Sequence, residues 1–102
     1  MWRYENTWTP SQASPPSLPS SLRVLTQNLW FDAHQREARM AGHLRQWQEA
    51  QPDIIAVQEA TLACLRPLLA DPWLQSRYYS SVSTDSPAHW QGVAVFSQFP
   101  AS

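Results

Sequence analysis

Two polar side chains, Asn28 and Glu59, each stand at the point where an apolar run ends. Glu59 closes the segment PDIIAVQE (residues 52–59), and Asn28 has the corresponding place in RVLTQNLW (residues 23–30). A carboxylate at the end of a buried strand has no packing role, so it needs a cation, a hydrogen-bond donor or water. Asn28 is also typical of a turn residue at a strand end, and the residue type alone favours that interpretation.

Both apolar runs predict β-strands. Residues 54–57 form a short run that is rich in β-branched types, which is typical of a strand buried on both faces of a parallel sheet. If the two strands are parallel neighbours, the crossover between them is right-handed, and Asn28 and Glu59 reach the same edge of the sheet. Ligands of open α/β sheets bind at that edge.

A helix is predicted between the two strands. Met40, Leu44 and Trp47 form an apolar stripe at helical spacing. Asp32 followed by Gln35 resembles a capping box at the helix start, and Pro52 ends the helix because the residue before a proline avoids the α region. The pattern further predicts a helix over residues 61–70, ended by an Asp-Pro pair, and strands over residues 77–82 and 93–97. The resulting fold class is α/β with an α+β-type mixed sheet.

Residues 1–21 are rich in proline and serine and show no period, so we expect a disordered tail followed by a folded part over residues 22–102. Trp2 and Trp8 within this tail either dock on the folded part or serve as a short partner motif. The net charge of −1 gives no case for a general nucleic-acid coat. We expect no secretory signal, no membrane span and no obligate oligomer. The single cysteine, Cys64, favours a reducing compartment, either cytoplasm or nucleus.

The order of the segments LTQNLW (25–30), PDIIAVQE (52–59) and GVAVFSQFP (92–100) resembles the N-terminal part of the endonuclease/exonuclease/phosphatase superfamily. The wording NLWFD (28–32) and a following helix with Arg36 and Arg39 look most like the tyrosyl-DNA phosphodiesterase-like branch. The resemblance implies a metal-dependent phosphoric-ester hydrolase whose fold is a four-layer α/β sandwich, with helices outside the β-sheets. For that branch it also implies a role in DNA repair.

The resemblance also implies roles for two residues. Glu59 matches the glutamate that binds the catalytic Mg²⁺, with Mn²⁺ as the alternative ion, and Asn28 matches the catalytic asparagine that helps to arrange metal and phosphate. Mg²⁺ suits such a sparse site because it prefers hard oxygen ligands and keeps several waters. The implied substrate is a phosphodiester, either DNA or a phospholipid or inositol phosphate.

One departure from the family pattern concerns the later motifs. An Asp-x-Asn pair, a further Asp and a closing Asp-His pair cannot be assigned in this sequence. We therefore expect the chain to be the front part of a longer hydrolase and to be inactive alone. The alternative is a non-catalytic α/β remnant that acts only as an interaction module. His34 and His43 are interpreted as solvated helix residues rather than ligands.

Overall fold

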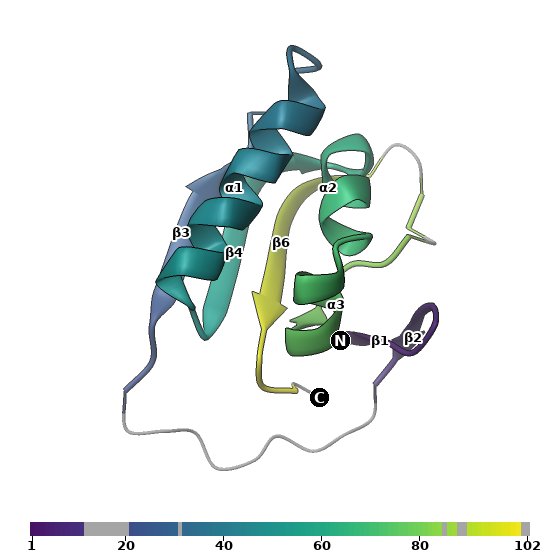
Figure 1. Cartoon of the computed structure of the whole chain (residues 1–102). Coiled ribbons are helices and arrows are strands. Elements are labelled where there is room, and N and C mark those ends of the chain that lie inside the picture. Colours follow the sequence, from purple (N-terminus) through teal and green to yellow (C-terminus); the bar gives the residue numbers. More distant parts are fainter. Residues whose placement is uncertain (12–20, 31, 85, 88–89, 101–102) are drawn as a thin grey trace.

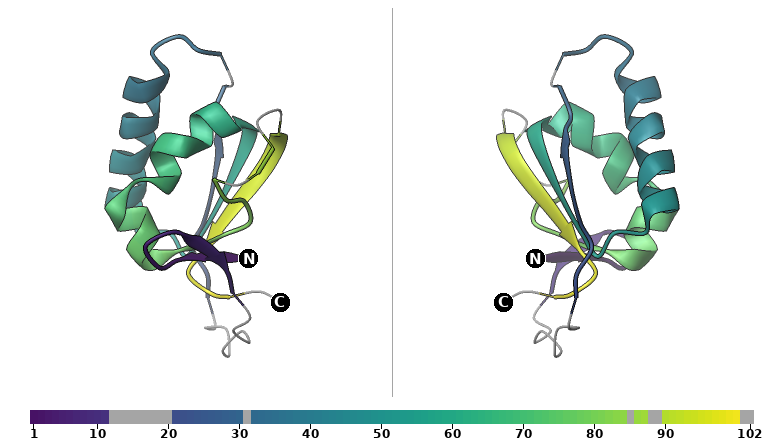
Figure 2. Two further views of the ribbon diagram at one scale, coloured as in Figure 1. Left: turned by 90° about the vertical axis from the view of Figure 1, so that its right-hand side faces the viewer. Right: turned by 90° about the vertical axis from the view of Figure 1, so that its left-hand side faces the viewer.

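A computed structural model describes residues 1–11, 21–30, 32–84, 86–87 and 90–100. In this part of the chain one six-stranded mixed sheet has the order β2-β1-β5-β6-β4-β3. Three helices lie on one face of the sheet (Figures 1 and 2). The elements in chain order are β1 (Trp2–Tyr4), β2 (Trp8–Pro10), β3 (Val24–Asn28), α1 (Arg36–Ala50), β4 (Ile54–Thr61), α2 (Leu62–Leu69), α3 (Pro72–Arg77), β5 (Tyr79–Ser80) and β6 (Gln91–Ser97). None of the described helices is long and apolar enough to cross a membrane.

The predicted β-α-β unit is confirmed. β3 and β4 pair in parallel, with Val24 opposite Ile54 and Asn28 opposite Gln58. The predicted stripe of α1 is buried, with Met40 and Trp47 fully enclosed. The helix ends before Pro52, as predicted, and Gln51 adopts a left-handed conformation there.

The start of α1 differs from the predicted capping box. The helix begins at Arg36, and Gln35 has φ 47° with no side-chain capping bond. A residue in the left-handed region cannot continue an α-helix, so the helix cannot extend back to Asp32. The carboxylate of Asp32 instead accepts a hydrogen bond from the backbone N–H of His34 at 2.7 Å. Asp32 therefore caps a turn in the loop before the helix.

The two faces of the sheet are covered unequally. On the helix side, Ile55, Val57, Ala94 and Phe96 are fully buried. On the other face, Val24 is 56% exposed and Val93 59% exposed, and Ile54, Ala56 and Val95 are only half-buried. The expectation of a strand buried on both faces is therefore wrong for β4. The described residues form two layers, one of helices and one of strands (Figure 2), and the mixed sheet confirms the predicted α/β class.

Residues 1–11 contain two strands that the sequence pattern did not predict. β1 and β2 form an antiparallel hairpin, and β1 pairs with β5 through Trp2 and Ser80. Trp8 is 4% exposed, and burial of so large a ring offsets the entropy lost on ordering the hairpin. Of the two alternatives for the tail tryptophans, docking on the folded part is confirmed. The rest of the Pro/Ser-rich segment, residues 12–20, lies outside the described residues.

The later elements follow the prediction in part. α2 begins after Thr61, whose hydroxyl accepts a hydrogen bond from the N–H of Cys64 at 3.3 Å. The Asp-Pro pair that ends this helix also starts α3, because the carboxylate of Asp71 accepts a hydrogen bond from the N–H of Leu74 at 3.1 Å and so caps the new helix. The sequence pattern did not predict α3. The strand expected over residues 77–82 is shorter, since only residues 79–80 pair. The strand predicted over residues 93–97 is confirmed as β6, which begins two residues earlier at Gln91 and lies between β4 and β5.

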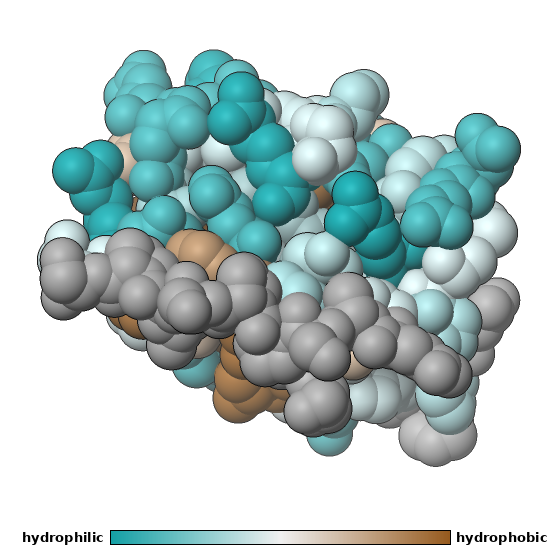
Figure 3. Space-filling model, turned by 90° about the horizontal axis from the view of Figure 1, so that it is seen from below, coloured by the Kyte–Doolittle hydropathy of each residue, from teal (hydrophilic) through white to brown (hydrophobic). Residues whose placement is uncertain are grey.

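Seen from the end where β3 and β4 begin, the surface on one side of the grey segment is mainly hydrophilic, and hydrophobic surface shows beside and below that segment (Figure 3). There the carboxylate of Asp53 accepts a hydrogen bond from the N–H of Arg23 at 2.8 Å, and the Arg23 guanidinium donates to the carbonyl oxygen of Ala50 at 2.5 Å. These polar contacts join the starts of the two parallel strands to the end of α1. The opposite end, where β3 and β4 finish, carries the residues of the candidate site.

Candidate functional site

Asn28 and Glu59 lie at the same edge of the sheet. Asn28 is the last residue of β3, and its register partner in β4 is Gln58, the residue directly before Glu59. The pairing continues one step further, because the N–H of Leu29 donates to the carbonyl oxygen of Gln58 at 2.9 Å. Adjacent strands are about 5 Å apart, so the backbones of Asn28 and Glu59 are near neighbours. Both residues are exposed.

A β-bulge carries Glu59. Val57 pairs with Ala94 and Ala60 pairs with Gly92, so Gln58 and Glu59 together face Val93. Glu59 has φ 52°, which few residues other than glycine adopt. Regular alternation after Ile55 and Val57 would put Glu59 on the helix side, where an unpaired carboxylate is costly. The extra residue places Ala60 there instead, fully buried. The bulge thus keeps the carboxylate in solvent at the strand end, a position that bulges often have beside active sites.

Asn28 forms the turn that its residue type favours. Its Oδ1 accepts a hydrogen bond from the backbone N–H of Trp30 at 2.8 Å, which closes an Asx turn at the end of β3. Trp30 has φ 51°, so the turn requires a left-handed residue. With Oδ1 engaged in this way, the Nδ2 hydrogens are the donors that Asn28 could give to an anionic ligand.

Arg39 fixes the loop that follows Asn28. Its guanidinium donates to the carbonyl oxygens of Leu29 at 2.9 Å, Trp30 at 2.7 Å and His34 at 2.9 Å, and also to that of Asp32. The same group lies 4.5 Å from the centroid of the Trp30 ring, within cation–π range. One side chain from the second turn of α1 thereby holds the loop between β3 and α1.

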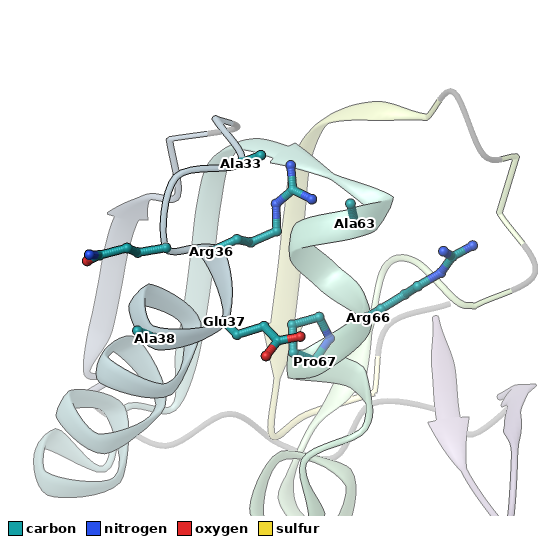
Figure 4. Close-up of a pocket in the computed structure, with 8 residues that line it drawn as sticks. Ala33, Arg36, Glu37, Ala38, Ala63, Arg66 and Pro67 are labelled. Atoms are coloured by element: carbon teal, nitrogen blue, oxygen red, sulfur yellow. The ribbon is translucent and has the colours of Figure 1, made fainter.

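A cleft of about 1270 Å³ lies between the start of α1 and α2. It opens at the same end of the molecule as Asn28 and Glu59, because Ala63 lies in the first turn of α2, just beyond the end of β4. In Figure 4 the Arg36 side chain extends toward α2, Glu37 points toward Pro67, and Arg66 points away from α1. Arg36 and Glu37 therefore bring one cation and one carboxylate to the α1 side of this cleft.

The histidines have different environments. His34 is exposed in the loop before α1, whereas His43 is half-buried on α1 and stacks on Trp47, with 6.1 Å between ring centroids. Burial, and to a lesser degree the charge of Arg39, lowers the pKa of His43. The described residues contain no group of three or more His, Cys, Asp or Glu side chains that could hold a metal ion.

Three features of this edge escaped the sequence reasoning. The bulge at Glu59 has no clear local signal in β4, although Gly92 on the facing strand, with φ 143°, hints at it. Arg39 was noted only as part of an arginine-bearing helix, since its partners are backbone carbonyl groups that no residue pattern reveals. Trp30 was identified only as part of a strand.

The chain was compared with known proteins at three levels. The model of the Endonuclease/Exonuclease/phosphatase family matches residues 25–102, which include β3, α1, β4 and β6. Comparison with curated proteins and with solved structures gave no match.

Proposed function

Because the chain belongs to the endonuclease/exonuclease/phosphatase family, we propose that it forms the front part of a divalent-metal-dependent hydrolase that cleaves phosphodiesters. One observation carries this proposal. The bulge in β4 sets the Glu59 carboxylate in solvent directly beside the end of β3, where Asn28 closes a turn. A carboxylate and a carboxamide at the ends of adjacent parallel strands match the oxygen-ligand chemistry of a phosphate-handling metal site.

Glu59 is the proposed ligand of Mg²⁺, with Mn²⁺ as the alternative. The donor set fits because Mg²⁺ binds proteins through one or two carboxylates and keeps water and phosphate oxygens as its other ligands. Glu59 is exposed, so those waters have room. When bound, the ion would neutralise charge on the phosphoryl oxygens and lower the pKa of a bound water. The strained backbone at Glu59 holds the carboxylate at one place on the sheet edge.

Asn28 is proposed to orient the phosphate. Its Oδ1 is held by the N–H of Trp30, so the plane of the carboxamide is defined before any ligand arrives. The Nδ2 group can then donate to a phosphate oxygen without paying for the ordering of its own side chain. Arg39 maintains this arrangement through its bonds to the loop carbonyl groups.

The substrate proposed within the family is DNA carrying a phosphodiester adduct, as for the tyrosyl-DNA phosphodiesterase-like branch. The support is the wording NLWFD at residues 28–32 and the arginines of α1. We expect the 102-residue chain to lack turnover by itself. Water activation and leaving-group protonation need acid–base groups in addition to Glu59.

The test is the substitution Glu59→Gln, which keeps the shape of the side chain and removes its charge. In a complete protein that contains this segment, we expect loss of Mg²⁺-dependent hydrolysis of a phosphodiester with little change in unfolding temperature. In the 102-residue chain, we expect Mg²⁺ to shift the amide signals of Glu59 and Asn28 in nuclear magnetic resonance spectra, and the substitution to remove these shifts.

Glu49→Gln is the matched control, because Glu49 is an exposed carboxylate at the other end of α1. It should leave both the activity and the Mg²⁺ shifts unchanged. Normal turnover of the Glu59→Gln protein would exclude Glu59 as the metal ligand. If the complete wild-type protein shows no turnover and the wild-type 102-residue chain binds no Mg²⁺, the alternative of a non-catalytic interaction module is favoured.

A further inference from the structure

Trp30 is a large aromatic side chain placed in solvent at the candidate site. It is 48% exposed, whereas the adjacent Leu29 is fully buried. Trp30 follows Asn28 by two residues, and its backbone N–H donates to Asn28 Oδ1, so its backbone lies at the same end of the sheet as Asn28 and Glu59. An exposed indole forgoes the free energy that burial of its apolar surface would contribute to folding.

The exposed ring is fixed in place. The backbone of Trp30 is held in a left-handed conformation by the bond from its N–H to Asn28 Oδ1. The guanidinium of Arg39 lies over the ring, 4.5 Å from its centroid, and the His34 ring is 6.2 Å away. Arg39 also donates a hydrogen bond to the carbonyl oxygen of Trp30, so one side chain contacts both the backbone and the ring of this residue. A ring that is already ordered can bind a ligand without a further loss of rotamer entropy.

We propose that Trp30 stacks against a planar aromatic ring of the ligand, next to the phosphate that Asn28 and Glu59 handle. This inference rests on the proposed function for the position of the phosphate. Arg39 occupies one face of the indole, which leaves the exposed part of the ring for a flat partner. Stacking of a base on an exposed aromatic side chain typically improves binding about tenfold. Trp30 would thereby select phosphate esters that carry a ring close to the phosphate.

An alkyl ligand is the competing partner for an exposed apolar side chain. Within the described part of the chain, the other exposed large apolar side chains are Leu22, Val24 and Val93. Leu22 and Val24 lie at the far end of β3, whereas Val93 lies on β6 opposite Gln58 and Glu59, with β4 between it and β3. Trp30 is thus a single flat surface backed by a cation, which suits stacking better than contact with a long alkyl chain.

The test compares four product-like phosphates bound to the 102-residue chain in the presence of Mg²⁺. Thymidine 5′-phosphate and phenyl phosphate carry a planar ring, 2-deoxyribose 5-phosphate has no ring, and butyl phosphate is apolar without being planar. Binding is followed through the Trp30 indole N–H signal, which is assigned by its absence from the spectrum of the Trp30→Phe variant. We expect the two ring-bearing phosphates to bind about tenfold more tightly than the others and to shift this signal.

Two variants and a control sharpen the comparison. Trp30→Phe should keep most of the preference for ring-bearing phosphates. Because this variant lacks the indole signal, its binding is followed through neighbouring amide signals. In Trp30→Leu, all four phosphates should bind with the same reduced affinity. Val24→Ala, at the far end of β3, should change nothing. Equal affinities in the wild-type chain, no detectable binding, an equal response to butyl phosphate, or a preference that survives in Trp30→Leu would each overturn the inference. The affinities of thymidine 5′-phosphate and phenyl phosphate, compared with each other, show whether Trp30 favours a nucleobase or a phenol ring.

Repeating the titration with Glu59→Gln separates this inference from the proposed function. If ring-bearing phosphates still bind more tightly than ringless ones, but Mg²⁺ shifts no signal of the wild-type chain, the proposed metal site is wrong and the role of Trp30 stands. If Mg²⁺ shifts Glu59 but ring-bearing and ringless phosphates bind equally, the metal site stands and the role of Trp30 is wrong.

Discussion

The indole N–H of Trp8 donates to the backbone carbonyl oxygen of Leu69 at 2.9 Å, across 61 positions of sequence. Leu69 is the last residue of α2, where carbonyl groups lack partners within the helix. A residue from the Pro/Ser-rich start of the chain therefore caps the C-terminal end of a helix. The Tyr4 ring packs edge-on against Trp8, with 5.6 Å between centroids, and completes this contact.

We expect Trp8→Ala to lower the free energy of unfolding by about 3 kcal/mol, because the substitution leaves a cavity and removes the bond to Leu69. Trp8→Phe keeps most of the volume and should cost about 1 kcal/mol. Urea unfolding followed by circular dichroism measures both effects. Thr7→Ala, at an exposed position before β2, is the control. An unchanged midpoint for Trp8→Ala would mean that the hairpin does not pack on the domain.

Arg39→Lys should destabilise the chain although it keeps the positive charge. An ammonium group cannot reproduce the fork that binds several carbonyl oxygens at once. We expect a loss of about 1–3 kcal/mol in stability and a changed environment for the Trp30 indole signal. Arg45→Lys, on the exposed side of the same helix, should have no measurable effect on either quantity. Equal stabilities of the two variants would show that Arg39 does not hold the loop.

The lowered pKa of His43 predicts that the folded chain loses stability in mild acid. Its pKa is lowered in the folded chain, first by burial and then by the charge of Arg39. The unfolded chain therefore binds a proton more readily, and the stabilising effect is complete above the ordinary histidine pKa of about 6.5 and decreases as the pH falls through that value. His43→Gln should show a flatter dependence of unfolding free energy between about pH 7 and pH 5.5. The control is His34→Gln, and a slope that His43→Gln leaves unchanged would contradict the prediction.

The two glycines should respond to alanine in opposite ways. Gly92 has φ 143° opposite the bulge, and a Cβ there would meet no atom within 4 Å, so the cost of Gly92→Ala is backbone strain of about 1–3 kcal/mol. Gly42 lies inside α1, where alanine raises helix stability by about 0.5–1 kcal/mol and its Cβ would make only an ordinary contact with Arg45 at 3.8 Å. Thermal unfolding of the two variants measures the difference, and a neutral Gly92→Ala would show that the bulge does not need glycine.

The sequence by itself determined the central β-α-β unit. The apolar period of α1, the short β-branched run of β4 and the breaks at Pro52 and Asp71 are local properties, and each has one favoured backbone conformation. Parallel pairing follows from the crossover helix, because a connection of this length returns the chain to the same end of the sheet. Asn28 and Glu59 could therefore be placed at one edge without a structure.

Only the tertiary structure decided how that edge is built. Strict alternation along β4 directs Glu59 into the core, and the bulge that prevents this depends on a pairing with β6 that lies far away in sequence. The four carbonyl groups held by Arg39 and the capping of α2 by Trp8 are likewise contacts between side chains and backbone groups, and the second of them spans 61 positions. Backbone carbonyl groups are the same in every residue, so residue types carry no record of which one a side chain will reach. The sequence also failed to predict the hairpin of residues 2–10, because the stability of this hairpin comes from the surface that it covers rather than from its own composition.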